Sequence, residues 1–206
     1  MKLELFINIV FLIVIGYFCY KFIRLLVKLK KDKIFPITNE ELIAIRTYPQ
    51  KVVRLPTISK QKTEIFLYSF LLLFIIGMYI IGVFFKGLDT SFYLLMFLPL
   101  SYSHNLLNLF AIINDGVLSG NRFVPWKKIK SFQFVLINLN HRYYGYSKEV
   151  NDGYELIMKE KFSTIRCIVT TNEAKEKLTK ILCDYGLEEA GVKGDEQCQI
   201  IGRDQK

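Results

Sequence analysis

Residues 115–134 read DGVLSGNRFVPWKKIKSFQF, and this stretch decides how the rest of the chain is interpreted. Asp115 and Ser119 are each followed by glycine, which marks turns, and the flanking residues partly alternate between polar and apolar. The pattern predicts a strand, a turn and a second strand, with the chain's single tryptophan, Trp126, among them. A small β-rich module therefore begins directly after an apolar segment.

Three apolar segments precede or adjoin this module, and each has the length of a membrane span. They cover residues 3–23, 65–85 and 91–113, and the second and third contain no charged residue. About 20 apolar residues cross a bilayer core as a helix. We therefore expect three transmembrane helices, the last two forming a hairpin over residues 64–113. Basic residues follow the first segment in place of a cleavage site, so residues 1–23 are expected to be an uncleaved anchor.

The distribution of charge predicts the orientation. The chain has 28 basic and 19 acidic residues and a net charge of +9. Most of this excess lies between Lys21 and Glu64, and such segments remain on the cytoplasmic side. We therefore expect a multi-pass protein of the cell (cytoplasmic) membrane, with its amino terminus outside and its carboxy-terminal module in the cytoplasm.

Residues 24–63 are expected to form a basic cytoplasmic connector. Thr38 and Glu41 have capping-box spacing, which predicts a short helix from Asn39 to about Thr47. A basic side chain close to an anionic membrane surface gains about 1 kcal/mol. The candidate contacts to anionic lipid headgroups are Lys28, Lys30, Lys31, Lys33, Arg54, Lys60 and Lys62.

Residues 114–187 are expected to form the cytoplasmic module. Further strands are predicted over residues 131–139, 153–158 and 164–170. A helix capped by Thr171 or Asn172 follows, with an apolar stripe that would close an antiparallel sheet or roll, so the fold class is α+β. The predicted core contains Trp126, Ile129, Phe132, Phe134, Leu156, Ile168, Leu178, Ile181 and Leu182. Residues 188–206 are polar and are expected to be a disordered tail.

The order of these parts resembles a known family. A transmembrane hairpin is followed by the run VPWKKIKSF, which places Pro125, Trp126, Ile129 and Phe132, and then by a closing helix that begins TNEAKEKL. Over residues 112–187 this resembles the bacterial PH-like (pleckstrin-homology-like) membrane proteins. The resemblance implies a PH-like roll and a membrane-anchored, non-enzymatic role, and it does not imply phosphoinositide binding.

A polar stripe in the third apolar segment is the most specific candidate site. Its members, at helical spacing after Pro99, are Ser101, His104, Asn105 and Asn108. Polar groups within a span mark either a functional site or hydrogen bonds between helices, here with Tyr68, Ser69 or Tyr79 of the second segment as partners. The second interpretation is favoured, because the second and third segments contain no acidic residue and no second histidine to complete a catalytic or metal site.

Other chemistry finds little support in the sequence. We expect no catalytic residues, no metal and no cofactor, because no phosphate-binding, dinucleotide-binding, zinc-protease or hydrolase motif occurs. Nucleic-acid binding is not expected, because the charge of the module is nearly balanced. His141 and its tyrosine-rich surroundings are expected to form a hairpin tip. Cys19, Cys167, Cys183 and Cys198 lack zinc-site spacing, and cysteines in a cytosolic module are expected to be reduced.

These features predict a multi-pass membrane-anchored interaction or scaffold protein that presents a PH-like cytoplasmic docking module. Its expected contacts are anionic headgroups and a protein partner that the sequence does not identify, and the sequence gives no oligomeric state. The alternative is a small transport or enzymatic membrane component that uses the polar stripe around His104.

Overall fold

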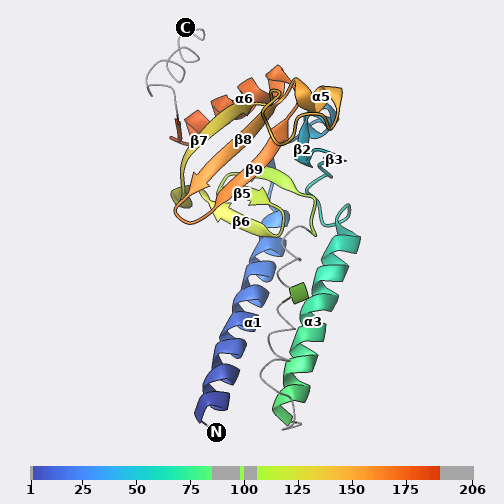
Figure 1. Cartoon of the computed structure of the whole chain (residues 1–206), viewed down its shortest axis with the longest axis vertical. Helices are drawn as coiled ribbons and strands as arrows, with labels where there is room; N and C mark the ends of the chain where they lie inside the picture. Colours follow the sequence, from blue (N-terminus) through green and yellow to red (C-terminus); the bar gives the residue numbers. More distant parts are fainter. Residues whose placement is uncertain (1, 85–97, 100–105, 191–206) are drawn as a thin grey trace. The chain divides into compact units, whose positions relative to one another are not determined.

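The computed structural model describes residues 2–84, 98–99 and 106–190, and in them the chain is a mixed α+β protein (Figure 1). The chain divides into two compact units. The helical unit contains Met1–Lys31, Pro56–Leu107 and Gly120–Phe123. The β unit contains Asp32–Leu55, Asn108–Ser119 and Val124–Lys206.

Two long helices make up most of the helical unit. They are α1 (Lys2–Leu29) and α3 (Lys62–Phe84), and both are long and apolar enough to cross a membrane. They pack through aromatic rings, with the centroids of Phe22 and Tyr68 4.6 Å apart. Many of their remaining large apolar side chains are exposed, which is unlike the buried core helices of a soluble protein.

The expected third transmembrane helix, residues 91–113, does not reach its expected carboxy-terminal end. Residues 85–97 and 100–105 lie outside the described residues, but Phe110–Ile113 form strand β4 and are fully buried. The expectation of a helix that continues to Ile113 is therefore wrong. Hydrophobicity alone does not separate a short buried strand from a buried helix. The Asn-Asp turn after β4 leads directly into its antiparallel partner β5 (Gly116–Ser119).

The strands form two sheets. The first sheet has the order β1-β4-β5-β6, with β1 (Lys33–Phe35) and β6 (Arg122–Pro125) at its edges. The second sheet has the order β10-β7-β8-β9-β2-β3 and is antiparallel except between β10 and β7. Its strands are β10 (Glu188–Glu189), β7 (Ile129–Leu136), β8 (Tyr154–Glu160), β9 (Thr164–Val169), β2 (Ile45–Tyr48) and β3 (Lys51–Val52).

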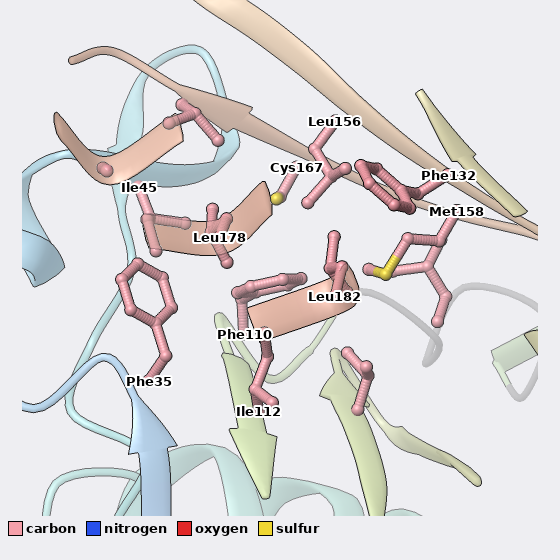
Figure 2. Packing of buried hydrophobic residues seen from close by; sticks show 14 of the residues in the cluster. Phe35, Ile45, Phe110, Ile112, Phe132, Leu156, Met158, Cys167, Leu178 and Leu182 are labelled. Carbon is pink, nitrogen blue, oxygen red and sulfur yellow. The ribbon is translucent and has the colours of Figure 1, made fainter. Parts of the chain in front are cut away.

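Helix α6 (Asn172–Asp184) closes the β unit as expected. Thr171 caps it by accepting a hydrogen bond from the Ala174 N–H, and Gly186 follows its end with φ of +75°. Side chains from both sheets and α6 meet in one core, as Figure 2 shows for Phe110, Phe132 and Leu182. All of the predicted core residues except Ile168 belong to this cluster or pack against it.

Ile168 is the exception because it faces the other side of the second sheet. Its neighbours Cys167 and Val169 point into the main core, whereas Ile168 packs with Ile137 and Val150. Alternate residues of a strand point to opposite faces. Cys167, Ile168 and Val169 are three apolar residues in succession, so the pattern of hydrophobicity did not distinguish the two faces there.

Residues 32–55, the middle of the segment expected to be a connector, are part of the β unit. β1 pairs with β4, and β2 pairs with β9. Phe35 and Ile45 are fully buried in the core. Their aromatic and branched side chains fill space between the sheets, so residues 32–55 complete the domain that follows them much later in the chain.

The predicted capping box is confirmed, although the helix after it is shorter than expected. Helix α2 (Asn39–Ile43) has the reciprocal hydrogen bonds of Thr38 and Glu41. Burial acts to raise the pKa of Glu41, but hydrogen bonds from Lys177 and from backbone N–H groups outweigh it and lower the pKa. The pair of Glu41 and Lys177 thereby joins α2 to α6.

The cysteines depart from the expectation of reduced thiols. Cys19 and Cys167 are free, and Cys183, on α6, is disulfide-bonded. Cys198 lies outside the described residues. Burial raises the pKa of the Cys167 thiol, so this cysteine is an unreactive part of the core.

Truncation of Phe35 tests whether the early segment belongs to the β unit. Phe35→Ala should lower the free energy of unfolding by about 3–5 kcal/mol, because it leaves a cavity in the shared core. Urea unfolding of the full chain in detergent, followed by the fluorescence of Trp126, measures the change. Ile37→Ala, at a side chain that is 64% exposed, is the control. Equal midpoints for the two variants would contradict the packing described above.

Candidate interaction surface of the second sheet

The outer face of the second sheet, opposite α6, is covered by the segment between β7 and β8. Val135 lies opposite Glu155, Glu155 lies opposite Ile168, and Ile168 lies opposite Arg46. Residues opposite each other share a face of a sheet, so these four side chains form one row across it. Two charged groups therefore sit on a face that residues 138–152 cover.

Glu155 anchors that covering segment. Its side chain is only 3% exposed, and Oε1 accepts a hydrogen bond from Arg142 Nη2 at 2.6 Å. His141 Nε2 lies 3.0 Å from Oε2, and Arg166 Nη1 lies 3.4 Å from Oε1. A buried carboxylate is tolerated only when it is paired and hydrogen-bonded, as it is here. The covering segment is therefore fixed to the sheet by charge.

Apolar contacts reinforce this attachment. Ile137, Val150 and Ile168 form a small buried cluster, and Tyr143 packs against it. The guanidinium of Arg142 lies over the Tyr143 ring, 4.4 Å from the centroid. Burial is the main cause that raises the pKa of Tyr143, so this phenol stays neutral. The expected hairpin tip is thus a folded layer with a core of its own.

The end of this layer forms one wall of an open depression of about 480 Å³. Ser147 caps helix α5 (Lys148–Asn151) by accepting a hydrogen bond from the Val150 N–H. The opposite wall is formed by α2, the start of β2 and the residues before α6. The lining residues are Glu40, Ile43, Ala44, Arg46, Lys148, Glu149, Asp152, Thr170 and Thr171.

Arg46 is the most constrained charged group in the depression. Its side chain is 15% exposed, Nη1 donates to the Pro49 carbonyl at 2.9 Å, and Nη2 lies 3.9 Å from Glu149 Oε2. Its Nε is buried without a hydrogen-bond partner in the described part of the chain. One donor of a rigid guanidinium therefore lies unpartnered beneath a surface that carries both signs of charge.

The charged groups of this surface are largely engaged with one another. Glu155 already has three partners, so its carboxylate is not placed to accept a substrate proton. Within residues 2–84, 98–99 and 106–190, no group of three or more His, Cys, Asp or Glu side chains could hold a metal ion. The surface offers hydrogen-bonding groups, charges and apolar contact on a rigid frame.

The polar stripe predicted in the third span is only partly visible. Ser101, His104 and Asn105 lie outside the described residues. Asn108 is not on a helix but in the irregular segment before β4, so the expected shared helix face does not extend to it. The side-chain Nδ2 of Asn108 donates to the Val52 carbonyl at 2.7 Å, and the backbone carbonyl of Asn108 accepts from the Arg54 N–H at 3.3 Å. Asn108 thus closes a junction within the β unit.

Tyr79, one of the suggested partners of that stripe, has another contact in the helical unit. Its hydroxyl donates to the Asn8 carbonyl of α1 at 3.2 Å, and its ring stacks on Phe11. Tyr68 packs against Phe22 of the same helix. Both tyrosines therefore contribute to the pairing of α1 with α3.

The candidate lipid contacts are divided between the two units. Lys28 lies in the last turn of α1, Lys30 and Lys31 follow the helix, Lys60 precedes α3 and Lys62 begins it, all in the helical unit. Lys33 and Arg54 lie in the β unit. Partial burial, the main cause, lowers the pKa of Lys33 although Asp32 acts to raise it. The Lys28 ammonium lies over the Phe123 ring, 4.8 Å from its centroid.

Sequence reasoning missed the role of Glu155 and Arg46. Both lie in short strands, where a charged residue normally indicates the solvent face. The available signal was the segment between β7 and β8, which contains Arg142, His141 and several tyrosines and is longer than a hairpin turn needs.

Neither a protein-family model, nor a curated protein, nor a solved structure matches the chain.

Replacing Glu155 should release the covering layer. Glu155→Ala leaves Arg142 and Arg166 without their shared carboxylate, and a hydrogen bond to a charged group is worth about 1.5–3 kcal/mol. Limited trypsin digestion should then cut after Arg142 and Lys148 much faster than in the unmodified chain. Glu149→Gln is the control, because this side chain is 64% exposed. Unchanged cleavage in the Ala variant would show that the layer is held by other contacts.

Proposed function

We propose that the protein is a multi-pass membrane-anchored interaction or scaffold protein whose β unit is a cytoplasmic docking module. The observation that carries this proposal is the depression beside α5. One of its walls belongs to the layer that a buried, fully partnered carboxylate holds, and its lining combines charges of both signs with hydroxyl and apolar groups. Such a surface binds a partner without transforming it.

Two features support a PH-like fold for this module. The strands of both sheets precede α6, which is the order that the sequence resemblance implies, except for the two-residue β10 in the segment expected to be a disordered tail. The residues that carried the resemblance, Trp126, Ile129 and Phe132, line the core or pack against it. Trp126 stacks on Tyr185 beside the closing helix, with ring centroids 4.3 Å apart.

The junction at Asn108 supports three membrane crossings. Arg54 and Asn108 are hydrogen-bonded, so the chain between them leaves the β unit and returns to it at one place. Helix α3 has 23 residues, enough for about 35 Å. If α3 crosses the bilayer, the chain has to cross back before Asn108. With α1 as an anchor, this gives the three spans proposed from the sequence, with basic residues at anionic headgroups on the cytoplasmic side.

Cysteine labelling tests the orientation. In a chain whose native cysteines are replaced by alanine, Gly87→Cys should react with a membrane-impermeant maleimide on intact cells. Glu176→Cys, on the exposed side of α6, should react only after permeabilisation. The result also bears on Cys183, which is disulfide-bonded, because disulfides are rare in a reducing cytosol. Labelling of Glu176→Cys in intact cells would show that the β unit is outside.

Site-specific photo-crosslinking tests the docking surface. A photoreactive residue at Ile43, which lines the depression and is 62% exposed, should give a discrete adduct with a protein partner in cells. Lys180, exposed on α6, is the control position and should not give that adduct. Charge reversal by Lys148→Glu should abolish the adduct at Ile43. Identical adducts at both positions, or none at Ile43, would contradict docking at this surface.

A further inference from the structure

One end of the second sheet gathers lysines around an exposed phenylalanine. In the register of β7 and β8, Ile129 lies opposite Glu160 and Ser131 lies opposite Lys159. The 3-10 turn before β7 (Trp126–Lys128) therefore lies beside the turn that joins β8 to β9. The exposed residues brought to this end are Lys127, Lys128, Lys130, Lys159, Lys161 and Phe162.

Phe162 is the unusual member of this group. It is 89% exposed, more than any other large apolar side chain in the described residues. The turn is well formed, because the Glu160 N–H donates to the Ser163 carbonyl and the Ser163 hydroxyl donates to Glu160 Oε1. The Lys161 ammonium lies 5.1 Å from the centroid of the Phe162 ring. An ordered turn thus presents an aromatic ring and a cation to the outside.

The balance of charge at this end is positive. Five lysines lie there, and the acidic group within the turn, Glu160, accepts a hydrogen bond from Ser163. Glu188 and Glu189 of β10 pair with Ser131 and Phe132, one strand further away on the other side of β7. The end of the sheet nearest the turn therefore suits an anionic surface.

The chain itself limits how far this end can be from the helical unit. Phe123 belongs to the helical unit, where its ring contacts Arg24 at 4.9 Å and Lys28 at 4.8 Å. Lys127 follows four residues later, and four residues span at most about 14 Å. Basic residues that end an apolar helix lie at the membrane interface. Lys127 and Lys128 are thus kept within reach of the headgroup layer, whatever the angle between the two units.

We propose that this end of the second sheet binds the anionic surface of the lipid bilayer, with Phe162 inserted at the boundary of headgroups and acyl chains. The lysines meet lipid phosphates, and the aromatic ring leaves water for the interface. This inference rests on the proposed membrane anchoring. It adds a second attachment of the β unit to the membrane, separate from the helices, and it would limit the orientations available to the docking depression.

Fluorescence quenching in vesicles tests the contact. The full chain, with its native cysteines replaced by alanine, carries an environment-sensitive fluorophore at Phe162→Cys. It is reconstituted into vesicles of phosphatidylcholine, with or without phosphatidylglycerol, that contain a lipid spin-labelled near the headgroup. With phosphatidylglycerol, we expect a blue shift and strong quenching. The matched control is Leu139→Cys, a 77% exposed apolar position beyond the opposite end of β7, which should show neither effect.

Charge removal provides the second comparison. Replacing Lys127, Lys128, Lys130 and Lys161 by glutamine should remove most of the quenching at position 162, whereas Lys180→Gln on α6 should not change it. Equal quenching at positions 162 and 139, or equal quenching with and without phosphatidylglycerol, would overturn the proposal. So would co-flotation with vesicles but no quenching at 162. A chain that does not float with vesicles would overturn membrane anchoring, and this inference with it.

Discussion

The pairing of residues 32–55 with residues 108–190 is the constraint on which the β unit depends. β1 adds an edge to the first sheet through β4, and β2 extends the second sheet through β9. The Ala44 carbonyl accepts from both the N–H and the hydroxyl of Thr170, which fixes β2 beside the start of α6. Without this early segment, the main core would lose Phe35, Leu42, Ile45 and Val53.

The same segment supplies half of the candidate docking surface. Ile43 and Arg46 come from it, whereas Lys148 and Glu149 come from the layer that Glu155 holds. The depression therefore exists only when the β unit is complete. This coupling explains why a buried ion network lies so close to an exposed surface. The network sets the position of α5, and α5 sets one wall of the depression.

In the first sheet, β5 and β6 approach each other so closely that one residue of β5 has to be glycine. Gly116, the first residue of β5, has φ of +154°, and a Cβ atom built on it would lie 2.1 Å from the Val124 carbonyl oxygen. Glycine is therefore required at this position, where β6 lies against β5. The Asp-Gly pair at this position was read from the sequence as a turn, and its second role became visible only with β6 in place.

The parts that could be predicted from sequence are those governed by local rules. The capping box at Thr38, the cap at Thr171, the end of α6 at Gly186 and the two apolar helices all follow from spacing and length. The parts that could not be predicted depend on partners distant in sequence. Phe110–Ile113 became a strand because β1 and β5 flank it, and Glu155 became buried because Arg142 and Arg166 reach it. No local pattern contains that information.

The junction of Arg54 and Asn108 has a consequence for how the protein is made. During synthesis, residues 32–55 emerge well before the strands with which they pair, and the apolar stretch that contains α3 comes between. The side chains of Phe35 and Ile45 therefore stay exposed until the ribosome has synthesised β4 and β9. Exposed apolar surface of this kind promotes aggregation. Insertion of the intervening segment into a membrane would hold the early strands near the ribosome during that delay, so biogenesis and folding of the β unit become a single process.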